Sequence, residues 1–202
     1  FKYLGANAKK YNVDVTYSTP GRFIKALYPQ NIKFEEKTDD FFPYADGPNA
    51  YWTGYFTSRV SIKGAVRKLG RFTQAMKKLA TQTLLQGSSS YVKNNFPAIN
   101  SALLTLEEAM ANGQHHDAVT GTERQIVAED YKLYFAKGEN AVKQQFLYPL
   151  LQEKVTKDLG LKNLQFSTCE LNTSAVFCGA TYNNLKGNKP VLLVINNPAQ
   201  TR

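Results

Sequence analysis

The sequence predicts a multi-domain fragment that is mainly α-helical: the end of an α/β domain, a three-helix bundle and the start of a β-sandwich domain. Two observations predict this organisation. Apolar residues recur at helical spacing through the middle of the chain. On both sides of that region, short alternating or apolar runs bounded by Gly, Pro and Asn are typical of strands. We place the three parts at 1–60, 61–160 and 161–202.

The first part alternates between helix and strand patterns. A helix is expected to end near residue 12, and the alternating segment 13–18 suits a short strand. Thr19 as N-cap and Pro20 at the first helical position then predict a second helix. Another strand is expected at 32–36. This order is typical of the closing part of an α/β domain.

Residues 39–59 form an aromatic segment in which seven aromatic rings lie among three acids, two prolines and two glycines. Gly and Pro interrupt regular structure, so we expect mainly loop. Flat rings stack on sugar faces and carboxylates accept hydrogen bonds from hydroxyls, which favours carbohydrate recognition. The alternative is that these rings fill an apolar core.

The middle part predicts helices at 61–86, from Pro97 to about Met110, at 122–136 and at 139–157. Three or four such helices pack as an antiparallel bundle. The pattern then changes to strand-like runs, which we take as the opening of a β domain; they lie at 164–167, 175–178 and 190–195.

The net charge of +9 at first favours nucleic acid or an anionic membrane as partner. The cations are spread along the expected helices without a tight basic run, so we expect no nucleic-acid partner. No segment is long and apolar enough for a transmembrane helix. The chain starts at Phe1 without a signal peptide and ends at Arg202 after a strand-like run, so both ends are expected to be cut.

The two cysteines, Cys169 and Cys178, lie on either side of the sequon that begins at Asn172. This arrangement favours a secreted or lumenal compartment, N-glycosylation of Asn172 and a local disulfide. The alternative is two free buried thiols and a chance sequon.

Both histidines of the chain are adjacent and precede an acid, in the order His115, His116, Asp117. Imidazole and carboxylate bind zinc and transfer protons. Adjacent residues on a helix or strand point apart, so we expect one histidine to be a ligand and the other its neighbour. The alternative is a polar contact between helices. A catalytic zinc keeps about three protein ligands, so further ligands are expected outside this chain.

Two long motifs resemble a known family. Asp40-Phe-Phe-Pro-Tyr-Ala-Asp46 with Tyr51-Trp-Thr-Gly-Tyr-Phe-Thr-Ser-Arg59, and then Gln114-His-His-Asp-Ala-Val-Thr-Gly-Thr122, closely resemble the class II α-mannosidases, glycoside hydrolase family 38. The forms around Pro43 and Val119 are most similar to the lysosomal branch. Val60 and Ile126 depart from the usual Pro and His of the family, which affects the subgroup and no expected site residue.

The resemblance implies a zinc-dependent retaining enzyme that removes terminal α-linked mannose from N-glycan oligosaccharides during glycoprotein catabolism. It assigns His116 as a zinc ligand and Asp117 as a sugar contact, with His115 and Asp46 as neighbours that shape the site and Asp46 as a second substrate contact. The nucleophile and the acid/base are expected upstream of Phe1, so no catalytic residue is assigned here.

The resemblance further implies a lysosome or equivalent acidic vacuole, with secretion as an alternative. Its partners would be sister chains cut from one precursor and mannose oligosaccharides, and association of identical copies is left open. Two other functions remain: a catalytically inactive relative that binds glycans, and a basic helical module for an anionic partner. The last leaves both motifs unexplained.

Overall fold

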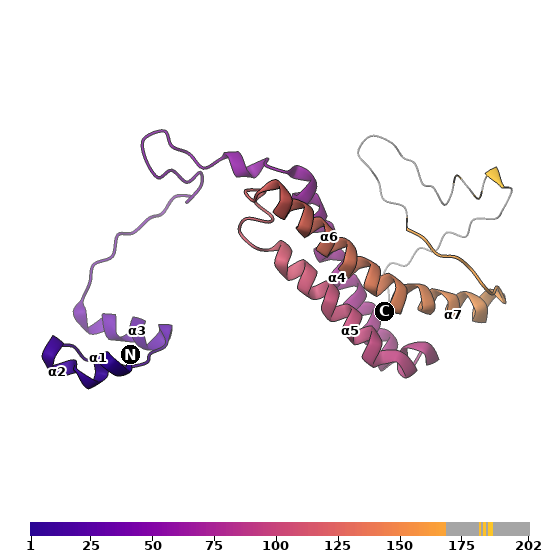
Figure 1. Ribbon diagram of the computed structural model, residues 1–202, viewed down its shortest axis with the longest axis horizontal. Coiled ribbons are helices and arrows are strands. Elements are labelled where there is room, and N and C mark those ends of the chain that lie inside the picture. Colours follow the sequence, from indigo (N-terminus) through magenta and orange to yellow (C-terminus); the bar gives the residue numbers. More distant parts are fainter. Residues whose placement is uncertain (169–181, 183, 185, 188–202) are drawn as a thin grey trace. The chain divides into compact units, whose positions relative to one another are not determined.

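The computed structural model describes residues 1–168, 182, 184, 186 and 187 (Figure 1). The chain divides into two compact units, Phe1–Tyr51 and Trp52–Arg202. The described residues are mainly helical and include no strand, which confirms the mainly α prediction. The predicted boundaries at 60/61 and 160/161 stay predictions, as does the β-sandwich.

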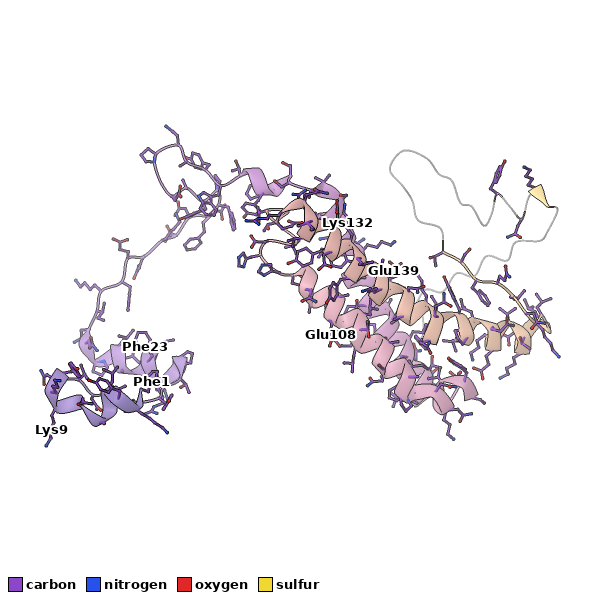
Figure 2. The ribbon with its side chains drawn as sticks, viewed as in Figure 1. Phe1, Lys9, Phe23, Glu108, Lys132 and Glu139 are labelled. Carbon is purple, nitrogen blue, oxygen red and sulfur yellow. The ribbon has the colours of Figure 1, made fainter. Side chains whose placement is uncertain are left out.

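The first unit contains the short helices α1 (Lys2–Ala6), α2 (Ala8–Tyr11) and α3 (Pro20–Leu27), followed by the 3-10 turn η1 (Tyr28–Gln30). Helix α3 begins as predicted: the Thr19 hydroxyl accepts a hydrogen bond from the Arg22 amide at 3.3 Å, and Pro20 occupies the first turn. None of these elements buries a residue. Large apolar side chains such as Phe1 and Phe23 stay exposed (Figure 2).

The strands predicted at 13–18, 32–36 and 164–167 are wrong, because all three segments are irregular. A strand requires a neighbour to satisfy its backbone hydrogen bonds. Within the described ranges the paired-strand contact is a single antiparallel bridge between Ala45 and Tyr51, in the aromatic segment predicted to be loop. The strands predicted at 175–178 and 190–195 lie outside the described residues.

The second unit begins with the 3-10 turn η2 (Gly54–Phe56) and the long helix α4 (Val60–Leu85). The buried positions of α4 are separated alternately by four and three residues, which is the spacing of a helix packed in a bundle. They are Ile62, Val66, Leu69, Thr73, Met76, Ala80 and Thr83. The buried Thr73 hydroxyl donates to the Leu69 carbonyl at 2.8 Å, so it costs little inside the core.

Helix α5 (Ser90–Gly113) begins seven residues before the predicted start at Pro97. Ser89 is the true N-cap, with its hydroxyl accepting from the Val92 amide at 3.1 Å. Pro97 lies exposed inside the helix. A proline is expected at the first helical position, because inside a helix it removes one backbone donor and its ring crowds the carbonyl four residues back; α5 nevertheless continues through Pro97.

Helix α6 (Gln125–Val142), the π-helical segment η3 (Lys143–Leu147) and α7 (Tyr148–Leu159) follow one another without a break (Figure 1). Two separate helices were predicted here, divided near Gly138. Gly138 instead permits close helix packing, because a Cβ there would lie 2.9 Å from the Ala109 Cβ. The core joins α4, α5 and this continuous segment, with Ile99, Leu106 and Phe146 completely buried.

The loop between α5 and α6 lies against the start of α4. Gly121 in this loop has φ +76°, and a Cβ there would lie 2.5 Å from the Ser58 carbonyl oxygen. Glycine therefore satisfies two requirements at once, a left-handed backbone and a close approach to the segment that leads into α4.

The N-terminus of α5 is capped from α7 by Glu153. Its carboxylate accepts the Ser89 hydroxyl proton and the amides of Ser90 and Tyr91, at 2.9 and 3.2 Å. Partial burial raises the pKa of Glu153, but these three hydrogen bonds and Lys154 outweigh burial and lower it. The carboxylate thus accepts hydrogen bonds from amides that have no partner within the helix, and its negative charge is favourable at the positive end of the helix dipole.

We expect Glu153→Gln to lower the free energy of unfolding by about 1–2 kcal/mol, because a charged capping acceptor becomes neutral. Since the folded pKa lies below the ordinary value of 4.5, this difference is complete above that pH and disappears as the pH falls through the folded pKa. Urea unfolding at pH 7 and at several acidic pH values measures it. Glu108→Gln, at an exposed carboxylate of α5 (Figure 2), is the control. Equal effects of the two variants would contradict the capping role.

Gly121→Ala is expected to destabilise the chain by about 2–3 kcal/mol, through left-handed strain and the clash with Ser58 together. Gly87→Ala separates these causes, because Gly87 has φ +57° and no atom within 4 Å of an added Cβ. It should cost about 1 kcal/mol. Denaturant unfolding of both variants checks the difference, and equal losses would show that the contact with Ser58 is unimportant.

Candidate metal centre

The predicted His-His-Asp cluster lies in a tight turn after α5. The His115 amide donates to the Asn112 carbonyl at 3.1 Å, and the His115 carbonyl accepts from the Ala118 amide at 2.9 Å. Ala118 is completely buried and fixes the turn to the bundle. Because the backbone leaves the helix here, the side chains need not diverge as they do along regular structure.

The two imidazoles converge on one carboxylate. Nε2 of His115 lies 3.3 Å and Nε2 of His116 lies 3.5 Å from Asp117 Oδ2, and the ring centroids are 4.4 Å apart. The expectation that the adjacent histidines point apart is therefore wrong. It assumed regular helix or strand geometry, whereas the turn brings both rings to the same side.

Asp117 is held by the residues that follow it. Its Oδ1 accepts from the Thr122 hydroxyl at 2.9 Å, and its carbonyl accepts from the Thr122 amide at 3.2 Å. The Thr122 hydrogen bond lowers the pKa of Asp117 most; burial acts in the opposite direction, and His116 and His115 lower the pKa further. The carboxylate consequently stays ionised in mildly acidic solution, ready to accept a hydrogen bond or a metal.

Two cations from the start of α4 hold the same loop. Lys63 Nζ donates to the carbonyls of Val119 and Thr120, both at 2.7 Å. Arg59 donates to the Glu123 carbonyl at 2.9 Å and to Gln125 Oε1 at 2.7 Å. Sequence reasoning missed both residues, because a contact between residues so far apart in the chain leaves no local pattern.

The side chains of Arg59 and Glu123 form a buried ion pair of poor geometry. Arg59 Nε lies 3.7 Å from Glu123 Oε1, and the Glu123 side chain is 2% exposed. Within the described structure, neither carboxylate oxygen of Glu123 accepts a hydrogen bond. The pKa of Tyr131 on α6 is raised. Burial is the largest cause, and the nearby negative charges of Glu123 and Asp117 raise this pKa further.

The side chains of His115, His116 and Asp117 could supply part of the coordination sphere of a zinc ion. Two imidazole nitrogens and a carboxylate oxygen lie within 4.8 Å of one another, and ligand atoms around tetrahedral zinc are separated by about 3.3 Å. The His116 side chain is 84% exposed and those of His115 and Asp117 are about half exposed. A metal held here would therefore be open on its outer side, where other ligands have access.

The remaining predicted site residues lie in the first unit or outside the described residues. Asp46 is exposed in the first unit, where its amide donates weakly to the Ala50 carbonyl at 3.4 Å. Its role as a substrate contact stays a prediction. Cys169, Cys178 and Asn172 lie outside the described residues. Across the described part of the chain, no helix has the length and apolar character to cross a membrane.

Comparison with known proteins identifies relatives along the chain. Residues 50–147 match the family model of the α-mannosidase middle domain. Lysosomal α-mannosidase of Dictyostelium discoideum is 33% identical over 204 residues, covering 99% of this chain and 20% of that protein. The human lysosomal α-mannosidase is 39% identical over 181 residues, covering 88% of this chain and 17% of that protein.

The lysosomal α-mannosidase of Bos taurus is 43% identical over 131 residues, which cover 65% of this chain and 12% of that protein. No solved structure matches. The chain spans about a fifth of the length of the curated relatives it matches. The match covers both motifs and the helical bundle, so the chain belongs to the α-mannosidases of glycoside hydrolase family 38.

Proposed function

We propose that this chain is part of a zinc-dependent retaining α-mannosidase that hydrolyses terminal α-linked mannose of N-glycan oligosaccharides during glycoprotein catabolism. The observation that supports this most is the convergence of His115, His116 and Asp117 within 4.8 Å. Retaining glycosidases use two carboxyl groups, a nucleophile and an acid/base. We assign both to a segment upstream of Phe1, so activity requires that segment as well.

His116 would hold the zinc ion, with further ligands from outside the chain. A bound zinc ion would orient sugar hydroxyls and stabilise developing negative charge on oxygen. The Nε2 atom of His116 must be unprotonated to bind a metal. His115 would pack beside it, consistent with the ring separation of 4.4 Å, and help to orient Asp117.

Asp117 would accept a hydrogen bond from a mannose hydroxyl. An ionised carboxylate offers about four lone pairs, and the Thr122 hydroxyl donates to one of them on Oδ1. A His116 Nε2 atom that binds a metal has no proton to donate, so a lone pair of Asp117 remains for substrate. The lowered pKa of Asp117 keeps it an acceptor in the acidic compartment that we propose.

The first unit is proposed to be the end of the α/β catalytic domain. Its apolar side chains are exposed, including Phe41, Phe42 and Tyr44. Clusters of this kind mark surfaces that bind another part of a protein or a ligand. Asp46, in the same segment, is the second proposed sugar contact.

The C-terminal residues from 161 are proposed to begin the β domain, with a disulfide between Cys169 and Cys178 and a glycan on Asn172. We place the protein in the lysosome or an equivalent vacuole, because lysosomal α-mannosidases are among its relatives. Sister chains of one precursor are the proposed partners.

Native material that contains this chain is expected to hydrolyse an aryl α-mannoside, to lose that activity to a zinc chelator and to regain it with added zinc. The reason is that the metal contacts substrate and is held on an open surface. Absorbance of the released phenol measures the rate. Absence of hydrolysis in zinc-replete, intact material would instead favour the catalytically inactive relative that binds glycans.

In that enzyme, His116→Ala is expected to lower zinc content and to reduce kcat/KM at least about 100-fold, since a direct ligand is lost. The melting temperature of the bundle should not change, because the side chain is 84% exposed. His115→Ala is the matched control and should retain most of the zinc. Asp117→Asn should raise KM more than it lowers zinc content. Full activity with bound zinc in His116→Ala would exclude the assignment.

A further inference from the structure

A hollow lies on the surface of α4, beside the loop between α5 and α6 that carries His115, His116 and Asp117; we call this loop, residues 114–124, the metal loop. Three cations of α4, each one helical turn from the next, contribute to its lining: Lys63, Arg67 and Arg71. The aromatic rings of Tyr55 and Phe56 border it from η2. From the metal loop and its start, the lining includes Gln114, Val119 and Thr120.

The charges of this hollow are not balanced by neighbouring acids. Elsewhere on α4, Lys77 pairs with Glu107 at 2.6 Å and Lys68 lies 3.9 Å from Glu139. Arg67 and Arg71 are exposed, and within the described residues neither side chain forms an ion pair or hydrogen bond. Like charges one turn apart repel each other, so the stripe costs stability unless an anion is bound.

The position of the cations along the helix increases this effect. They occupy the first four turns of α4, which has no acidic residue in its first turn. The N-terminus of a helix carries partial positive charge, and cations are least favourable there. This effect falls off within the first turn, so it applies to Lys63, while Arg67 and Arg71 extend the positive charge along the same surface.

Lys63 connects the hollow to the metal loop. Its ammonium group has three donors, and two of them go to the Val119 and Thr120 carbonyls at 2.7 Å. The third remains available to a group in the hollow. An anion bound there would contact the residue that fixes the loop, without contacting the histidines.

We propose that this hollow is a binding site for an anionic group, a phosphate or a carboxylate on a small ligand. Guanidinium groups bind both in a two-pronged geometry. The rings of Tyr55 and Phe56, packed edge to face, supply an aromatic border. This inference is independent of the proposed mannosidase activity, because none of these residues is assigned to the metal or to mannose.

The test is titration of the 202-residue chain at low salt with inorganic phosphate, with glucuronate and with neutral mannose, followed by NMR of amide and arginine Nε signals. We expect one or both anions to shift the Arg67, Arg71 and Gln114 signals saturably, and mannose to leave them unchanged. A stronger response to phosphate or to glucuronate identifies the preferred anion. Binding should weaken as salt is added.

The double variant Arg67→Gln/Arg71→Gln is expected to weaken anion binding about tenfold, because two exposed charge contacts are lost. Lys93→Gln/Lys132→Gln removes the same charge from exposed positions of α5 and α6 and should change affinity less than about twofold. Lys132 lies on α6 (Figure 2) and is not among the residues that line the hollow. Absence of saturable shifts, or equal weakening in both double variants, would overturn the proposal.

Discussion

The contact between Arg59 and Glu123 is the constraint on which the position of the metal loop depends. Arg59 lies at the residue before α4 with φ +46°, a left-handed backbone that is unusual for arginine. From there its side chain contacts Glu123 and Gln125, and Gly121 packs on the adjacent Ser58 carbonyl. A buried pair with unsatisfied oxygens adds little net stability, but removing one partner leaves an uncompensated charge. The pair therefore specifies one arrangement of the loop rather than strengthening the whole fold.

The bundle was predictable from sequence because its signal is local. Ile62, Val66 and Leu69 repeat at helical spacing, and the predicted helix differs from α4 by about one residue at each end. The errors in helix boundaries arose where tertiary packing outweighed the local preferences of proline and glycine. Pro97 was taken as a helix start, although Ser89 caps the helix eight residues earlier. Separate helices were predicted at 122–136 and 139–157, although Gly138 between them lies inside α6, where two helices approach closely. The strands failed for a different reason, since a strand forms only with a partner.

The site was predictable in composition and not in geometry. The chemistry of His115, His116 and Asp117 follows from their residue types. Their convergence depends on an irregular turn, which no periodic pattern in the sequence predicts. Arg59 and Lys63 act across more than fifty residues of sequence, so only folding reveals them. The open side of the cluster has a simple chemical meaning. A shell with three donors at a surface has low selectivity among metals until outside ligands fix its geometry.

The π-helical segment Lys143–Leu147 has a consequence for how this family can tolerate length changes. Such a segment holds an inserted residue within an otherwise regular helix. A π turn holds about 4.4 residues, so five residues in π geometry turn the chain by about 410°, close to the roughly 400° of four residues in α geometry. Deleting one residue there and returning to α geometry would therefore leave Glu153 facing Ser89 and Leu150 facing the core. A deletion inside α7 has no such segment to absorb it and would rotate every later position by about 100°.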